Sequence, residues 1–450
     1  MNILIVNGSP KGENSITLQT CLYIRKHFPA HNYAVLDAGS KVHSLQKDFS
    51  PALQSLAVAD LIIFSYPVYT FLAPSQLHSF ISQMKTACSD GALSLEGKVA
   101  TQITTSKHFY DVTAHRYVRD NCADMGLNFI SGLSADMDDL LSREGRSQAK
   151  AFFSQLLWKI ERGYFDAPSV KPVDYNPALA TVPAQTIRRP ARGKKIALVS
   201  DIIPGDAGLK AMIDRFVSSV PYECEIVNIR EFPFKGGCLS CFNCAADGRC
   251  VYNDGFDSLL RDKVQSCSAI VYAFRIVDHS MGLRFKMYDD RQFCNGHRTV
   301  TEGTPFAYLV SGPLSSEENL RTVIEARAQV GGNYLAGIAS DETDPDTQID
   351  RLVECLCYAI SNGYSEPRNF YGVGGMKIFR DLIYTMRGMM RADHRFFRKH
   401  GQYDFPQKQC LMSMKMYLVG WLMRNKKLKA KAGDRISEGM IAPYKKALEK

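Results

Sequence analysis

Four cysteines lie close together in a pattern suited to metal binding. They are Cys238, Cys241, Cys244 and Cys250, spaced C-x2-C-x2-C-x5-C after Gly236-Gly237, which allows a tight loop. Two-residue gaps let consecutive thiolates from one loop reach one metal centre, whereas core packing requires no such spacing. The spacing favours a [4Fe–4S] cluster, because zinc sites more often use two C-x-x-C knuckles separated by a longer excursion. A zinc ion and a loop without metal are the alternatives.

A second candidate site lies where the first expected strand, residues 2–7, runs into a helix. The turn reads Gly8-Ser9-Pro10-Lys11-Gly12-Glu13-Asn14-Ser15-Ile16-Thr17-Leu18. Such a turn points free backbone N–H groups and the positive end of the helix dipole at one spot, and the hydroxyls of Ser9, Ser15 and Thr17 add donors. It matches neither the P-loop nor the dinucleotide fingerprint, so a phosphate monoester is the favoured ligand. A strand-to-helix turn without a ligand is the alternative.

This turn resembles the FMN-phosphate loop of the flavodoxin-like NAD(P)H-dependent FMN reductases and quinone reductases. Two later segments, 64–71 and 104–111, resemble the loops with which that family completes its flavin site, and all three follow expected strands. The resemblance implies that FMN is bound by Ser9, Lys11, Asn14, Ser15, Ile16, Thr17, Pro67, Val68, Tyr69, Thr70, Thr105, Ser106, His108 and Tyr110. It implies no catalytic side chain, because the flavin itself carries the redox chemistry.

The second half of the chain resembles the iron–sulfur flavoprotein branch of the same superfamily. The four cysteines, Asp254 and the segment 281–291 ending in Asp-Arg carry this resemblance. The half begins with a loop, 200–208, that lacks the Gly-Ser-Pro start and contains Asp201 and Asp206, whose carboxylates would repel an anion. The first half has no comparable cysteine cluster. We therefore expect FMN in the first half and a [4Fe–4S] cluster in the second, in a pseudo-dimer within one chain that could itself form a homodimer.

The chain repeats one pattern of strands and helices. Aliphatic runs predict strands at 2–7, 61–65 and 99–103 in the first copy and at 195–200, 269–273 and 306–310 in the second. Helical stretches such as 15–26 and 208–220 alternate with them, which indicates βαβ units around a buried parallel sheet. We predict an α/β fold of two tandem flavodoxin-like, doubly wound parallel-sheet domains plus a C-terminal helical extension.

The expected divisions follow composition. Residues 1–163 form the FMN-binding domain, 164–194 a proline-rich linker, 195–364 the domain with the cysteine loop, and 365–450 a basic helical extension. The extension holds 19 Lys and Arg against 7 Asp and Glu, which gives it a net charge of +12. Because the whole chain carries +9, the net charge of residues 1–364 is about −3. No stacking platform or reader motif accompanies this charge, so nucleic-acid binding is not expected.

The extension also contains a nearly apolar run, 412–423, followed by the basic run 424–431. It is too short to span a bilayer. Packing of this helix on the chain's own domains is favoured over contact with a membrane surface or a partner. Thirteen cysteines without an export signal indicate reduced thiols and a cytoplasmic location.

These features predict a flavin-dependent oxidoreductase that moves electrons from NAD(P)H or a reduced carrier protein to a quinone or another small organic acceptor. The first alternative is an NAD(P)H-dependent FMN or quinone reductase whose cysteine loop holds zinc or nothing. The second is an electron carrier or redox-responsive binding protein without a substrate of its own.

Overall fold

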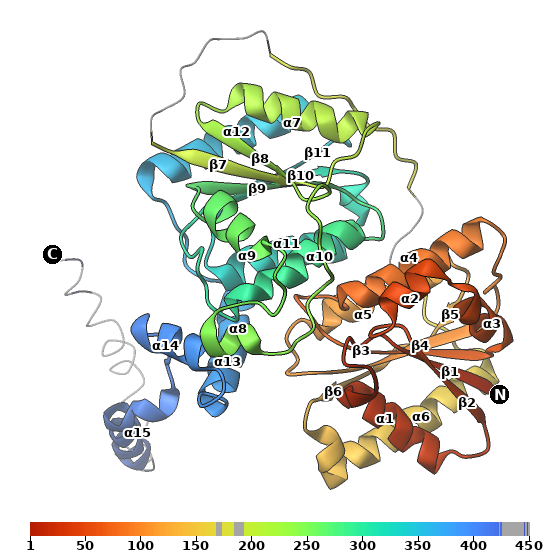
Figure 1. Ribbon diagram of the computed structural model, residues 1–450. Coiled ribbons are helices and arrows are strands. Elements are labelled where there is room, and N and C mark those ends of the chain that lie inside the picture. Colours follow the sequence, from red (N-terminus) through yellow and green to blue (C-terminus); the bar gives the residue numbers. More distant parts are fainter. Residues whose placement is uncertain (168–172, 184–192, 423, 425–444, 446–447, 449–450) are drawn as a thin grey trace. The chain divides into compact units, whose positions relative to one another are not determined.

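The computed structural model describes residues 1–167, 173–183, 193–422, 424, 445 and 448 (Figure 1). By its internal contacts the chain divides into two units, Met1–His394 and Arg395–Lys450. The first unit contains both sheets. The four-part division expected from the sequence stays a prediction.

The N-terminal half, β1 to α6, is built around a parallel sheet in the order β2-β1-β3-β4-β5, with β6 pairing beside β4. Its strands are β1 (Asn2–Asn7), β2 (Asn32–Asp37), β3 (Leu61–Pro67), β4 (Val99–Ser106), β5 (Asn128–Phe129) and β6 (Leu133–Asp136). Its helices are α1 (Ile16–His27), α2 (Val42–Lys47), α3 (Ser50–Val58), α4 (Ser75–Ser89), α5 (Asp111–Asp124) and α6 (Arg143–Arg162). This is the strand order of flavodoxin.

The C-terminal half, β7 to α12, repeats that order as β8-β7-β9-β10-β11. Its strands are β7 (Lys195–Ser200), β8 (Glu223–Asn228), β9 (Ala269–Arg275), β10 (Phe306–Ser311) and β11 (Leu335–Ser340). Its helices are α7 (Ala207–Ser219), α8 (Asn243–Asp247), α9 (Phe256–Ser258), α10 (Gly282–Arg291), α11 (Glu318–Gly331) and α12 (Pro345–Asn362). The predicted fold class, two tandem flavodoxin-like sheets followed by helices, is confirmed.

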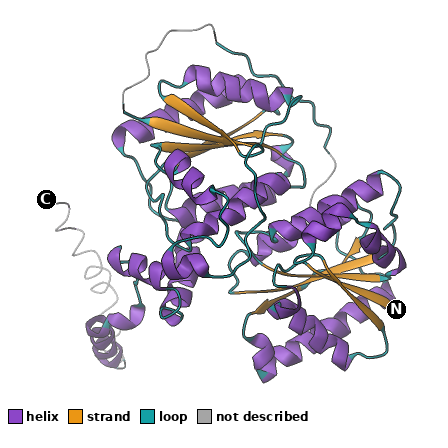
Figure 2. Ribbon diagram, viewed as in Figure 1, coloured by secondary structure: helices purple, strands orange, loops and turns teal. Residues whose placement is uncertain are grey.

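The central strands β1, β3, β4, β7, β9 and β10 are buried along most of their length because helices cover both faces of each sheet, as Figure 2 shows. In β3, residues Leu61 to Tyr66 are all buried. Helices α1 and α6 pack together on one face of the first sheet, where Leu18, Ile24 and Phe153 join the core of β1, β3 and β4. This packing fixes the strand ends, from which the predicted flavin loops start.

Three helices follow the second sheet: α13 (Phe370–Thr385), α14 (Arg391–Lys399) and α15 (Cys410–Leu422). Helix α13 packs on α11 and also reaches the N-terminal half, where Phe379 lies 4.5 Å from Phe109 between ring centroids. The hydroxyl of Tyr110 donates to the carbonyl of Tyr371 at 2.9 Å. No helix among the described residues is both long enough and apolar enough to cross a bilayer.

Equivalent helices of the two halves pack against each other. Helix α4 contacts α10, and both follow the third strand of their own sheet in chain order; α5 contacts α11, and both follow the fourth. The same surface of each half therefore meets its counterpart, as in an isologous contact between two subunits.

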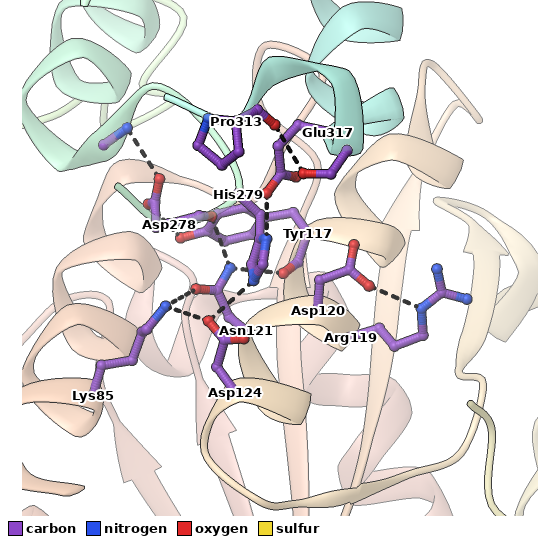
Figure 3. A network of polar contacts seen from close by, with 12 residues as sticks. Lys85, Tyr117, Arg119, Asp120, Asn121, Asp124, Asp278, His279, Pro313 and Glu317 are labelled. Atoms are coloured by element: carbon purple, nitrogen blue, oxygen red, sulfur yellow. Dashed lines mark hydrogen bonds and ion pairs between the residues drawn. The ribbon is translucent and has the colours of Figure 1, made fainter. Parts of the chain in front are cut away.

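A buried carboxylate stabilises this interface (Figure 3). Asp278 Oδ2 accepts the hydroxyl of Tyr117 at 2.9 Å and lies 3.1 Å from His78 Nδ1, while the amide of Asn121 donates to its backbone carbonyl at 3.0 Å. The His78 ring stacks on Tyr117 at 3.9 Å. Burial lowers the pKa of His78, so the ring is neutral at pH 7 and its Nδ1–H donates to Asp278.

The neighbouring residue, His279, bridges two further acids. Its Nε2 lies 3.0 Å from Asp124 and its Nδ1 2.8 Å from Glu317 (Figure 3). Burial alone would lower the pKa of His279, but the hydrogen bonds to Asp124 and Glu317 and their charges raise it to about 10. His279 therefore carries a positive charge at neutral pH and joins α5 to α11.

Replacing His279 should change how stability depends on pH. The pKa of His279 is about 10 when folded against 6.5 for an unperturbed histidine, so its stabilisation is complete below pH 6.5 and is lost as the pH rises toward 10. We expect His279→Gln to lower the melting temperature most near pH 6 and little near pH 10. The exposed His43 provides the control variant His43→Gln. An equal effect of His279→Gln at both pH values would contradict the charged bridge.

Candidate functional site

The three predicted flavin loops meet at one edge of the first sheet. Parallel pairing places Asn7 beside Ser65 and Pro67 beside Thr105, so the carboxyl ends of β1, β3 and β4 are aligned. The side chains of Thr17 and Thr105 meet there, with 2.6 Å between their hydroxyl oxygens. In a sheet of this topology, ligands bind outside the carboxyl ends of the strands.

A cavity of about 220 Å³ opens at this edge and is lined by both halves of the chain. It has roughly fifteen times the space that one water molecule needs, enough for an organic ring system. Eleven of the fourteen predicted flavin residues line it: Ser9, Lys11, Ser15, Ile16, Thr17, Pro67, Val68, Tyr69, Thr70, Thr105 and Ser106. All four predicted metal-binding cysteines, Cys238, Cys241, Cys244 and Cys250, line the same cavity. That these residues bind flavin or metal stays a prediction.

The three remaining predicted residues do not line the cavity. Asn14 lies exposed on a single 3-10 turn before α1. His108 pairs with Asp111, with 2.8 Å between Nδ1 and the carboxylate. The Tyr110 hydroxyl is used in the bond to α13 described above. Both His108 and Tyr110 have positive φ angles, 58° and 53°, so the backbone turns sharply after β4.

Local hydrogen bonds shape the turn between β1 and α1. Ser15 is the N-cap of α1, and its hydroxyl oxygen accepts the backbone N–H of Leu18 at 3.3 Å. The Ser9 hydroxyl oxygen accepts the N–H of Lys11 at 3.3 Å, and the Asn7 amide donates to the carbonyl of Gly12 at 2.9 Å. Both serine hydroxyls still have a hydrogen to donate. The first N–H groups of a helix have no acceptor within it, so the turn suits a bound anion.

The cysteine loop follows β8 and bends repeatedly. Ser240 and Phe242 both adopt left-handed backbone conformations, with φ of 50° and 62°. A Cβ on Gly237 would lie 2.0 Å from the hydroxyl oxygen of Ser75 in the other half, so a larger residue here would force the Ser75 side chain to move. The loop therefore touches the start of α4 directly.

One backbone N–H group approaches a sulfur of this loop. The N–H of Ser240 lies 3.4 Å from Cys238 Sγ. Burial raises the pKa of Cys244 to about 12, with smaller contributions from Asp393 and the neighbouring cysteines, and burial raises the pKa of Cys238 as well. Without a metal both thiols stay protonated at pH 7. Bound iron would favour the thiolates, and N–H donors at sulfur are one of the means by which proteins tune such clusters.

The four cysteines do not converge on one point. Among the described residues, no group of three or more His, Cys, Asp or Glu side chains is arranged to hold a single metal ion. A zinc site needs such convergence, whereas a [4Fe–4S] cluster binds each cysteine through a different iron and needs the thiolates around a larger volume.

Helix α10 holds the second predicted flavin loop, which follows β3, in place from the opposite half. Lys286 Nζ lies 2.5 Å from Asp290 and donates to the carbonyl of Tyr69 at 2.7 Å. Asp290 accepts the N–H of Ser75 at 2.8 Å and the hydroxyl of Thr70 at 3.2 Å. Both charged side chains are 0% exposed. A buried pair with all these partners fixes the geometry between the halves.

The next residue of α10 holds the cysteine loop. Arg291 makes two 2.8 Å hydrogen bonds to the carboxylate of Asp254 and donates to the carbonyl of Gly236 at 3.1 Å. Its guanidinium also stacks over Tyr252, 4.4 Å from the ring centroid. Across the interface, the amide of Gln76 donates to the carbonyl of Cys238 at 3.2 Å. The cysteine loop is thus attached to both halves.

Several cavity residues were not identified from the sequence. They come from the segment after α10 and from α13 and make the wall largely apolar: Phe293, His297, Ile378, Phe379 and Leu382. His297 Nδ1 lies 3.1 Å from the buried carboxylate of Asp393. No local motif marks these positions. The buried pair on α10 was also missed, although the i, i+4 spacing of Lys286 and Asp290 could have been recognised in the sequence.

The equivalent edge of the second sheet is built differently. The carboxylate of Asp341, after β11, accepts the Ser311 hydroxyl at 2.6 Å and the N–H of Gly312 at 2.9 Å. It also lies 2.8 Å from where a Cβ of Gly208 would be, in the first turn of α7. Tyr175 covers the same carboxylate, donating its hydroxyl at 2.6 Å. An internal carboxylate thus occupies the place where the first half offers a site for an anion.

Asp201 and Asp206, the two carboxylates expected to repel an anion at this edge, are not both free negative charges there. Burial raises the pKa of Asp201 to about 7, so its charge is partial at neutral pH. Asp206 pairs with Arg275 at 3.2 Å. The carboxylate that lies beside the first turn of α7 is that of Asp341, which was not identified from the sequence.

Comparison with known proteins agrees with this architecture. Residues 1–133 match the family model described as a flavodoxin-like fold. Over 173 residues the chain is 25% identical to an iron-sulfur flavoprotein of Archaeoglobus fulgidus, a match that covers 36% of this chain and 78% of that protein. The family model and the strand order together define a flavodoxin-like fold for the N-terminal half, and the second sheet repeats its order.

Solved structures with related folds include two reductases. The NAD(P)H:quinone oxidoreductase from Methanothermobacter marburgensis is 12% identical, with a TM-score of 0.29, over 37% of this chain and 99% of that one. An FMN-dependent NADH-azoreductase from Bacillus anthracis in complex with FMN is also 12% identical, with a TM-score of 0.27, over 35% of this chain and 99% of that one.

The buried pair on α10 should be important for stability. Lys286→Met leaves the Asp290 carboxylate buried without its cation, so we expect the free energy of unfolding to fall by about 3–5 kcal/mol. The matched control is Lys210→Met, which removes the cation of an exposed i, i+4 pair with Asp214 and should have little effect. Urea unfolding measures both. If the two variants were equally stable, the proposed role of the buried pair would be wrong.

Proposed function

We propose that this protein is a flavin-dependent oxidoreductase with FMN in the N-terminal half and a [4Fe–4S] cluster on the cysteine loop. One observation carries the proposal: the turn between β1 and α1, the loop after β3 and the four cysteines all line one cavity. When bound, FMN supplies hydride and one-electron chemistry and the cluster supplies one-electron transfer. The proposal includes NAD(P)H or a reduced carrier as electron donor and a quinone or another organic molecule as acceptor.

The chain's own residues would bind and shield these groups. The turn from Ser9 to Thr17 supplies N–H and hydroxyl donors for a phosphate, and Lys11 adds a positive charge beside it. Phe242, from the cysteine loop, lies under the Lys11 ammonium at 5.4 Å. The apolar wall from Phe293 and α13 excludes water, which favours an apolar or aromatic acceptor.

The relatives support the same chemistry at a coarser level. One is named an iron-sulfur flavoprotein, and the solved structures cited above are named as reductases of quinones and azo compounds. The proposal places the protein in a reducing, cytoplasmic compartment, because its sequence contains thirteen cysteines and no export signal was recognised. An FMN reductase without a cluster, with the wall of this cavity as its substrate site, is the second candidate function.

Lys11 should contribute to FMN binding. We expect Lys11→Met to weaken binding of FMN to the apoprotein about tenfold, because a charge-assisted contact to the phosphate is lost. The quenching of FMN fluorescence on binding measures the dissociation constant. Lys26→Met, at the other end of α1, is the control. Unchanged affinity in Lys11→Met would place the phosphate elsewhere.

The cysteine loop should hold iron independently of the flavin. We expect Cys238→Ser, purified without oxygen, to lose most of its iron and acid-labile sulfide while it retains FMN, because one cluster ligand is lost. The exposed Cys355 gives the control Cys355→Ser, which should keep the full iron content. Retention of FMN with equal iron in both variants would exclude Cys238 as a ligand. Activity with NAD(P)H and a quinone, compared between the two variants, separates the cluster-dependent enzyme from a plain reductase.

A further inference from the structure

Helix α15 exposes an unusual amount of apolar surface. None of its side chains is buried. Tyr417 is 82% exposed, Leu411 73% and Trp421 65%, so the largest side chains of this helix face water. The other exposed apolar residues are Met412, Met414, Met416, Leu418, Val419 and Leu422. Surface helices of globular proteins normally have a polar face opposite the apolar one.

Helix α15 has no such polar face. Its 13 residues contain only Ser413, Lys415 and Gly420 as polar or small interruptions. At 100° per residue the apolar side chains lie on nearly every side of the helix axis. A helix that is apolar all round is normally covered by protein or by lipid.

The length of α15 limits what can cover it. A helix of 13 residues is about 20 Å long, too short for the roughly 30 Å hydrocarbon core of a bilayer but long enough to enter one leaflet. Tyr417 and Trp421 are the residue types that prefer the boundary between lipid and water.

The positive charge of the sequence after α15 favours lipid over protein as the cover of this helix. Arg424, Lys426, Lys427, Lys429 and Lys431 follow the helix with no acidic residue among them. Basic residues beside an apolar segment are attracted to anionic lipid headgroups. A second copy of this chain would bring the same positive charge to the contact, so like charges would oppose self-association through this segment.

We propose that α15 binds the surface of an anionic lipid membrane, with the helix in one leaflet. The basic residues after Arg424 lie outside the described residues, and their sequence adds the positive charge that anionic lipid attracts. The sequence favoured packing of this helix on the chain's own domains, and the experiment below separates the two alternatives. The proposal stands on a different part of the chain from the flavin cavity and does not depend on it.

The chain offers a direct probe, because it contains only two tryptophans, Trp158 and Trp421. In the full-length variant Trp158→Phe, tryptophan fluorescence comes only from Trp421 in α15. We expect Trp421 emission to shift to shorter wavelength with vesicles of an equal mixture of phosphatidylglycerol and phosphatidylcholine, and much less with phosphatidylcholine alone. Added salt should weaken the binding.

Two variants in this background test the two parts of the proposed surface. Leu418→Asp should abolish the shift, because a charge replaces apolar surface in the leaflet. Removing two cations in Lys426→Gln/Lys427→Gln should weaken partitioning about 30-fold, as measured by co-sedimentation. The control Lys26→Gln/Lys150→Gln removes two exposed cations from α1 and α6 and should bind like the parent.

Three results would overturn the proposal. Trp421 emission that is already at short wavelength without vesicles, and unchanged by them, would mean that protein covers α15. A dimer in sedimentation velocity that Leu418→Asp converts to monomer, without vesicle binding, would identify a second copy as the partner. Equal binding of the charge variant and its control would show that the basic sequence takes no part.

Discussion

The site depends on one helix that serves two loops. Lys286 and Asp290 of α10 are fully buried and attach the loop after β3, and Arg291, next in the chain, attaches the cysteine loop through Asp254. Isolated buried charges are costly, so this helix tolerates them only with partners drawn from both halves. The same three residues therefore determine the distance between the predicted flavin site and the four cysteines. Tandem duplication keeps these partners within one chain.

Duplication created two equivalent edges, and the structure shows how they diverged. The first edge keeps a turn of hydroxyl and N–H donors before α1 and opens into the cavity. At the second, Asp341 lies beside the first turn of α7 and Tyr175 covers it. A carboxylate at a helix N-terminus satisfies the positive end of the dipole that a phosphate would otherwise use. Because of this difference between the two edges, the proposal expects one anion site per chain.

Much of this arrangement could be predicted from the sequence, because it follows from local patterns. Apolar runs bounded by turn residues gave the strands, and the spacing of Cys238, Cys241 and Cys244 marked the loop. The residues that complete the cavity, such as Phe293 and Phe379, are separated in sequence from these motifs and are brought there by helix packing. Asp341 was missed for the same reason, since only β-sheet pairing and the fold of residues 173–183 place it beside α7. His108 and Tyr110 follow β4 as expected, yet neither lines the cavity, and both have left-handed backbone conformations that the sequence does not mark.

The central claim is that one flavin and one iron–sulfur cluster share a cavity between the duplicated halves. The most direct test is the content of FMN, iron and acid-labile sulfide in the full chain purified without oxygen. The account predicts about one FMN, four iron and four sulfide per chain. Absence of FMN, or two FMN per chain, would contradict it, because the first result removes the site before α1 and the second restores the site that Asp341 occupies.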